Sequence, residues 1–182
     1  EDKFLKFLGR CHDAATALKS FSVLRRAGFE NINVDLMFAY PGQERHHLMR
    51  DMNDIRRLGC EHVSLYSLGV EPRSRFFLED MTPLSQEIQA EYYMLIGDIL
   101  ERYGFQQYEI SNFARPGRES RHNMHYWKGG NYIGLGVGAH SHFDGHRHAN
   151  ILSVRQYIKR TSKDEPVIVQ EEALSPEQRF RE

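Results

Sequence analysis

The sequence contains little cysteine. Among 182 residues there are two cysteines, Cys11 and Cys60, which lie far apart and form no C-x-x-C pair. This excludes a disulfide framework and gives no sign of a cysteine metal site. We therefore expect the reducing environment of the cytoplasm.

Long apolar runs and an excess of one charge are also missing. No apolar run approaches the roughly 18 residues that a membrane span requires, and no signal-peptide pattern is present, which predicts a soluble protein. The formal net charge is only −1, with 24 basic and 25 acidic residues. Nothing in this balance favours a nucleic-acid partner.

Helical and strand-like patterns alternate in the first part of the chain. The pattern predicts helices at 13–27, 44–59, 85–104 and 153–159 and strands at 32–40, 62–70 and 105–111. The alternation before residue 111 is typical of an α/β fold with a parallel sheet, whose helices share one side if the sheet curves into a barrel. Beyond it, glycine, histidine and aromatic residues dominate, so we divide the chain into 1–111 and 112–182.

The last residues predict the beginning of another helix. Ser175 is a suitable N-cap, Pro176 the first helical residue and Gln178 the capping-box partner. Such a helix would stop after about two turns. We therefore expect a piece of a longer protein, with a frayed terminal helix as the alternative.

Asp35 and Arg10 are the first candidates for chemistry. Asp35 lies within an apolar predicted strand, where a buried carboxylate needs hydrogen-bond donors or a cation to offset its desolvation. In a β/α fold such a group can face the end where ligands bind, but a structural carboxylate that caps a loop is the open alternative. Arg10 has no distinguishing pattern by itself.

Gly134, Gly136 and Gly138 alternate with apolar residues. In an extended segment they would form one bare side that another backbone or a flat ligand could approach closely. The following Asp144-Gly145 pair signals a hairpin turn instead of a helix, which argues against a dinucleotide-binding loop.

Residues 120–150 hold six of the ten histidines. A two-residue hairpin loop at Asp144-Gly145 pairs Phe143 with His146 and Ser141 with His148. Cross-strand partners share a face, so the hairpin histidines separate into two pairs on opposite faces: His140 with His142, and His146 with His148. We therefore expect no zinc site, although a distorted loop would reopen the question.

His122 lies in the segment "RHNMHYW" together with Asn123 and Tyr126. An imidazole beside aromatic surface is able to bind haem iron and the macrocycle. A packed aromatic turn with a hydrogen-bonded histidine is the alternative.

Four longer motifs carry a family resemblance: "INVDLMFAYPGQ", "HVSLYSLGVEP", "QYEISNFARPGRESRHNMHYW" and "YIGLGVGAH". With them the chain closely resembles radical S-adenosylmethionine proteins related to oxygen-independent coproporphyrinogen III oxidase, and in particular their haem-chaperone branch. The resemblance implies the later part of an incomplete (β/α)6 barrel followed by a C-terminal α/β region with a β-hairpin. It also implies a [4Fe–4S] cluster, whose C-x-x-x-C-x-x-C ligands are absent here and are expected upstream.

The resemblance assigns roles to three residues of the first part. Arg10 falls on the arginine that pairs with the carboxylate of S-adenosylmethionine, and Asp35 on a carboxylate among the groups that contact its methionine end. Gly69 falls where a small residue leaves room for this cofactor. The usual "GLPGQ" is "AYPGQ" here, with Ala39 and Tyr40, so the loop after Asp35 is expected to differ in shape.

His122, Asn123 and Tyr126 match the "HN-x-x-Y" signature that separates haem chaperones from true oxidases and is linked to haem binding. The resemblance implies a cytoplasmic protein that accepts haem and delivers it to haem-requiring membrane enzymes, with which it associates. Radical oxidative decarboxylation of coproporphyrinogen III is the alternative function. Whether any radical chemistry is performed, and whether the full-length protein is a homodimer, are left open.

Overall fold

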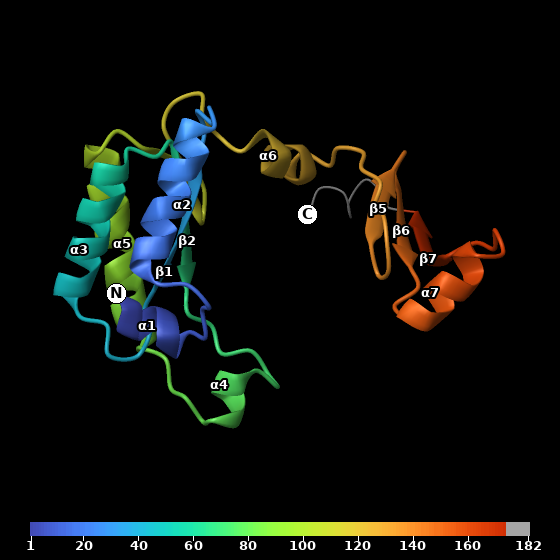
Figure 1. Ribbon diagram of the computed structural model, residues 1–182, viewed down its shortest axis with the longest axis horizontal. Coiled ribbons are helices and arrows are strands. Elements are labelled where there is room, and N and C mark those ends of the chain that lie inside the picture. Colours follow the sequence, from blue (N-terminus) through green and yellow to red (C-terminus); the bar gives the residue numbers. More distant parts are fainter. Residues whose placement is uncertain (174–182) are drawn as a thin grey trace. The chain divides into compact units, whose positions relative to one another are not determined.

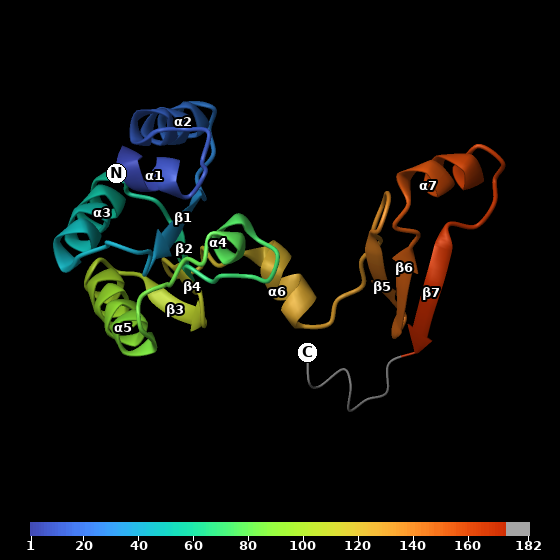
Figure 2. The same cartoon turned by 90° about the horizontal axis from the view of Figure 1, so that it is seen from below.

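Helices cover one face of a four-stranded sheet in the first of two structural units (Figures 1 and 2). The computed structural model describes residues 1–173, and the first unit spans Glu1–Glu119. Its helices are α1 (Asp2–Phe7), α2 (Ala14–Arg26), α3 (Arg45–Leu58), α4 (Arg75–Leu78) and α5 (Gln86–Arg102). Its strands are β1 (Asn33–Phe38), β2 (His62–Ser67), β3 (Gln106–Glu109) and β4 (Asn112–Ala114).

The three long helices of this unit begin and end close to the predicted positions. The Asp13 carboxylate caps α2 by accepting a 2.7 Å hydrogen bond from the backbone N–H of Thr16. Ser85 caps α5 in the same manner. Gly59 ends α3 in the left-handed conformation, with φ 63°.

The sheet is mixed, which corrects the expected all-parallel arrangement. β1 and β2 are parallel, but the strand order is β1-β2-β4-β3, with β4 antiparallel to both of its neighbours. The chain turns back at Ile110 and Ser111, and β4 takes the place beside β2 that β3 would occupy in a parallel sheet. In the described residues this sheet is open and forms no closed barrel.

The two faces of the sheet differ in chemistry. Val34, Leu36 and Phe38 of β1 pack toward the helices, where Leu48 of α3 and Ile96 of α5 are completely buried. On the opposite face, Asn33 and Asp35 of β1 are polar and exposed, whereas Met37 packs in a second apolar cluster with residues of α1 and α4. The three long helices α2, α3 and α5 therefore share one side of the sheet.

The second unit begins at Ser120. Its elements are α6 (Arg121–Trp127), β5 (His140–Phe143), β6 (His146–Asn150), α7 (Val154–Thr161) and β7 (Ile168–Ala173). β4 pairs with β2 and so belongs to the first unit, which extends that unit past the boundary expected between residues 111 and 112. The helix predicted at Ser175 lies outside the described residues.

The hairpin of β5 and β6 has the register that the sequence predicts. Phe143 pairs with His146, and His140 pairs with Ala149. Asp144 and Gly145 have φ values of 54° and 80°, as a type I′ turn requires. The histidine pairs of the hairpin consequently lie on opposite faces of the sheet.

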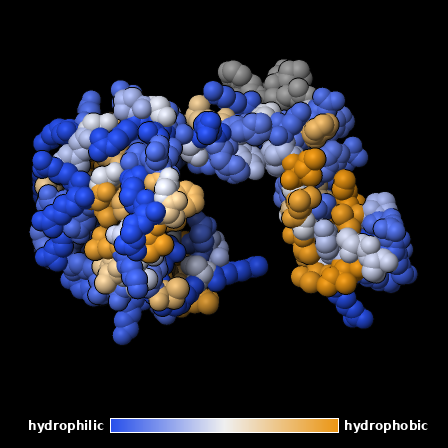
Figure 3. All heavy atoms as spheres, turned by 45° about the horizontal axis from the view of Figure 1, so that its top comes forward, coloured by the Kyte–Doolittle hydropathy of each residue, from blue (hydrophilic) through white to orange (hydrophobic). Residues whose placement is uncertain are grey.

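Apolar surface is extensive on the second unit, part of which Figure 3 shows in orange. Within its described part, Ala149 and Ile151 are the buried hydrophobic residues, whereas Leu135 and Leu152 are 89% and 82% exposed. A three-stranded sheet with so small a core gains little from hydrophobic burial. This unit therefore depends strongly on its backbone hydrogen bonds.

Candidate functional site

Asp35 lies on the polar face of β1, opposite the helices, and its side chain is exposed. The expectation of a buried carboxylate is wrong, because Asp35 alternates with Val34 and Leu36, which take the buried side. Its Oδ1 accepts a 2.7 Å hydrogen bond from Nδ2 of Asn33. Asp35 is therefore oriented by a neighbour and accessible to a ligand.

A chain of side-chain hydrogen bonds continues from Asn33 across the sheet. Nδ1 of His62 lies 2.7 Å from Oδ1 of Asn33, and Nε2 of His62 lies 2.6 Å from the hydroxyl of Tyr108. His62 is only 3% exposed, and this burial lowers the pKa of its imidazole. These residues were not predicted for the site, since a histidine in an apolar strand carries no specific functional signal.

Arg10 and Asp35 line the same cavity of about 370 Å³. Nη2 of Arg10 lies 3.3 Å from Sδ of Met37, the next residue after Asp35 on the same face of β1. β1 is an edge strand of the sheet, so the cavity wall includes residues from both of its faces as well as residues of α1, α2 and α3. Besides the Arg10 guanidinium, the wall holds four carboxylates, those of Glu1, Asp35, Asp51 and Asp54.

The "AYPGQ" loop closes the cavity at the end of β1. Tyr40 is buried in its wall, with its ring centroid 4.4 Å from that of Phe4. Ala39 has a positive φ of 60°, a conformation that favours glycine. An alanine therefore occupies the left-handed position here, and the neighbouring Tyr40 ring packs against α1.

Gly69 follows β2 and is exposed. A Cβ atom built there would meet Oε1 of Glu71 at 3.7 Å, an ordinary contact, so folding does not require glycine at this position. In the described chain Gly69 does not line the cavity that holds Arg10 and Asp35.

His122, Asn123 and Tyr126 lie on α6. The rings of His122 and Tyr126 meet edge to face, with centroids 4.9 Å apart, and the Tyr126 ring lies 4.6 Å from that of Tyr132. Ser120 caps this helix by accepting a hydrogen bond from the backbone N–H of Asn123. The structure therefore presents an exposed imidazole beside two adjacent aromatic rings.

The glycine-rich segment is not the bare strand that we expected. Gly136 and Gly138 have positive φ values of 105° and 65°, so the chain turns instead of extending. Gly134 nevertheless permits a close backbone approach, because a Cβ atom there would overlap the carbonyl oxygen of His140.

Metal-binding groups are dispersed. In residues 1–173, no three side chains of histidine, cysteine, aspartate or glutamate are grouped so that they could hold a metal ion. Cys11 is exposed, whereas Cys60 is buried, and this burial raises the pKa of its thiol to about 11. Two cysteines do not fit the three-thiolate cluster site, so the chain itself does not supply that site.

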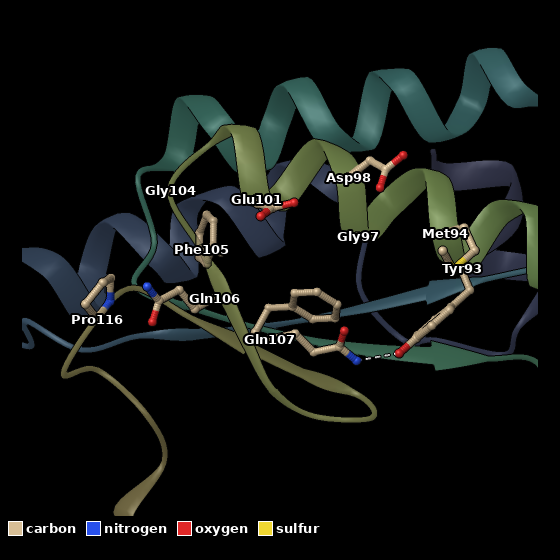
Figure 4. A pocket seen from close by; sticks show the side chains of 11 residues that line it. Tyr93, Met94, Gly97, Asp98, Glu101, Gly104, Phe105, Gln106, Gln107 and Pro116 are labelled. Atoms are coloured by element: carbon tan, nitrogen blue, oxygen red, sulfur yellow. Dashed lines mark hydrogen bonds between the residues drawn. The ribbon is translucent and has the colours of Figure 1, made fainter.

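A larger hollow of about 700 Å³ lies between α5 and β3 (Figure 4). Tyr93 and Gln107 join across it through a 2.6 Å hydrogen bond. None of the residues predicted from the sequence lines this hollow.

No helix in the described part of the chain is both long and apolar enough to cross a membrane.

Two curated relatives resemble the chain closely in sequence. It is 44% identical to the heme chaperone HemW of Bacillus subtilis over 162 residues, which cover 87% of this chain and 43% of the relative. It is 37% identical to the heme chaperone HemW of Lactococcus lactis, covering 98% of this chain and 48% of the relative. The chain thus spans less than half the length of these relatives. No protein-family model matches the chain.

The solved structure of coproporphyrinogen III oxidase (HemN) from Escherichia coli, a radical SAM enzyme, matches the fold. The TM-score is 0.81 at 17% identity, covering 100% of this chain and 45% of the solved one. Fold and relatives together define a radical S-adenosylmethionine protein. More narrowly, the chain belongs to the family of the HemW heme chaperones and HemN-like proteins.

Proposed function

We propose that the chain is part of a haem chaperone built on an incomplete (β/α)6 radical S-adenosylmethionine barrel. The observation that carries this proposal is the common cavity of Arg10 and Asp35, the two residues to which the family resemblance assigns the cofactor. In the complete protein we expect S-adenosylmethionine and a [4Fe–4S] cluster with upstream ligands. Haem would be delivered to haem-requiring membrane enzymes from the cytoplasm.

The two charged side chains fit the two charged groups of the methionine end. The guanidinium of Arg10 is able to bind a carboxylate through two parallel hydrogen bonds. Oδ2 of Asp35 is able to accept from an ammonium group while Oδ1 keeps its bond to Asn33. Gly69 would leave space for the remainder of the cofactor. When bound to the cluster, the cofactor supplies a radical, and the residues of this chain orient it and exclude water.

Haem binding is assigned to His122, Asn123 and Tyr126. An exposed imidazole is a suitable axial ligand for iron, and the rings of Tyr126 and Tyr132 offer aromatic surface to the macrocycle. Asn123 lies next to His122 on the first turn of α6.

Haem titration of the complete natural protein tests this assignment. We expect His122→Ala to remove the shift of the Soret band that accompanies binding. His46→Ala, which removes an exposed histidine of the first unit, serves as the matched control and should preserve the shift. An unchanged spectrum and affinity in His122→Ala would exclude His122 as the ligand.

The cofactor assignment needs a separate measurement. Equilibrium dialysis of S-adenosylmethionine against the protein with a reconstituted cluster should show weaker binding for Arg10→Met and for Asp35→Asn, by about tenfold each. Asp164→Asn, in an exposed loop, is the control. Anaerobic incubation with coproporphyrinogen III and a reductant distinguishes the alternative, because formation of protoporphyrinogen would establish the oxidase activity instead.

A further inference from the structure

We propose that Asn33 and His62 are positioning residues that hold the Asp35 carboxylate in the orientation required for the cofactor. The inference rests on the proposed function, because it concerns the residue assigned to the methionine end of S-adenosylmethionine. It adds two residues to the site: Asn33 contacts Asp35 directly, and His62 acts through Asn33. Both lie within motifs that carry the resemblance, but the resemblance assigned no role to either.

The hydrogen bonds fix the direction of each donor. An ionised Asp35 is only an acceptor, so the group of Asn33 that faces it at 2.7 Å is the amide N–H. The amide oxygen of Asn33 then points toward His62 and accepts from its Nδ1 at 2.7 Å. His62 is consequently the Nδ1–H tautomer, and its Nε2 accepts a 2.6 Å hydrogen bond from the hydroxyl of Tyr108.

Burial makes this arrangement rigid at its far end. His62 is 3% exposed and lies on β2, and Tyr108 lies on β3, so the imidazole is held from two strands. Burial favours the neutral ring, which has one donor and one acceptor for its two partners. A buried hydrogen-bonding group that loses its partner carries a desolvation cost, and this cost resists rotation of the ring.

A second branch restrains the same amide. The hydroxyl of Ser64 lies 3.2 Å from Oδ1 of Asn33 and 2.9 Å from Oδ1 of Asn112. Nδ2 of Asn112 donates to Glu109 at 2.7 Å. Because Ser64 has a single hydroxyl hydrogen, which is shared with the nearer Asn112, its contact with Asn33 is the weaker restraint on this exposed side chain, and His62 provides the stronger one.

Asp35 lies at the exposed end of this chain of hydrogen bonds. Its Oδ1 is engaged by Asn33, whereas Oδ2 has no hydrogen bond within the described part of the protein. The geometry therefore leaves one carboxylate oxygen for a cationic group and sets the angle at which that oxygen is presented. A freely rotating aspartate would lack this preorganisation and would lose conformational entropy on binding.

Matched substitutions of His62 test the proposal in the complete natural protein with a reconstituted cluster. The amide nitrogen of Asn can replace Nδ1, whereas that of Gln replaces Nε2. His62→Asn therefore keeps the donor to Asn33, and His62→Gln loses it. Binding of S-adenosylmethionine is measured by equilibrium dialysis, and the thermal midpoint of each variant is recorded.

We expect Asn33→Ala and His62→Gln each to raise the Kd about tenfold, the loss of one hydrogen bond to a charged group. His62→Asn should stay within about threefold of the natural protein. A purely structural role would instead weaken binding equally in both His62 variants, in step with their thermal midpoints. Asn33→Ala decides the matter if both His62 variants unfold, because the Asn33 side chain is exposed.

Natural affinity in Asn33→Ala, or equal losses in His62→Asn and His62→Gln, would overturn the positioning role. Asp35→Asn separates this failure from failure of the proposed function. If Asp35→Asn weakens binding while Asn33→Ala does not, only the positioning role is lost. If Asp35→Asn binds normally, the cofactor assignment and the inference fail together.

Discussion

The backbone N–H of Ala39 donates a 2.6 Å hydrogen bond to Oε1 of Gln43. Both residues are buried, and the bond closes the turn that follows β1. This turn places Tyr40 in the wall of the cavity with Arg10 and Asp35. The shape of the candidate site therefore depends on one amide side chain.

Replacement of Gln43 by Met should destabilise the protein. The substitution keeps the approximate volume but removes the acceptor for a buried N–H, which costs about 1–3 kcal/mol. Urea unfolding measures the loss. Gln106→Met, at an exposed position of β3, should change the free energy of unfolding by less than about 0.5 kcal/mol. Equal effects at the two positions would contradict the structural role of Gln43.

Stability should decrease on mild acidification because of His62. Burial lowers the pKa of this imidazole below its ordinary value of 6.5, against the opposing effect of Asp35 and Glu119. The unfolded chain therefore binds the proton more readily, so stability is full above the unfolded pKa and is lost as the pH falls through about 6.5 toward the folded pKa.

Urea midpoints between about pH 7.5 and pH 5 test this dependence. We expect a shallower decline in His62→Asn than in the natural protein. Burial also lowers the pKa of His47, so part of the decline should persist in the variant. Identical slopes for the two proteins would show that His62 does not contribute.

The two thiols should differ strongly in reactivity. Cys11 is exposed, whereas burial raises the pKa of Cys60 to about 11, so little of the Cys60 thiolate forms at neutral pH. Ellman's reagent should modify Cys11 rapidly and Cys60 only after addition of denaturant. Cys11→Ser should remove the rapid phase, and a rapid phase that persists in this variant would contradict the burial of Cys60.

Gly134→Ala should disturb the second unit. The new methyl group would overlap the carbonyl oxygen of His140, and relief requires backbone movement that costs about 1–3 kcal/mol. Hydrogen exchange at the amides of β5 and β6 should become faster. Gly69→Ala is the matched control, because its new Cβ atom would lie 3.7 Å from Oε1 of Glu71, an ordinary contact. It should leave these exchange rates unchanged.

Local signals predicted much of the secondary structure. Asp13 and Ser85 mark helix starts, and Asp144-Gly145 sets the complete register of a hairpin, because each signal acts through hydrogen bonds or dihedral angles of adjacent residues. β4 was missed because three residues, Asn112–Ala114, are too short to show a periodicity. The choice of its partner strand depends on long-range packing.

The candidate site was predictable only in part. Arg10 and Asp35 could be named, but which face of β1 is buried depends on where the helices pack, so the exposure of Asp35 did not follow from its apolar neighbours. The prediction of an extended strand from the alternating glycines was wrong for another reason. The backbone of Gly136 and Gly138 has positive φ values, which bend the segment. His62 opens the motif "HVSLYSLGVEP", but that motif assigns it no role, and the positioning role that we propose rests on its partners in space.

The place of β4 between β2 and β3 also constrains the order of folding. β3 and β4 are adjacent in sequence, so their hairpin is able to form early and locally. β2 reaches β4 only after the intervening chain with α4 and α5 has closed into a long loop, which has a larger entropic cost. We therefore expect the pairing of β2 with β4 to be the late step that completes the sheet.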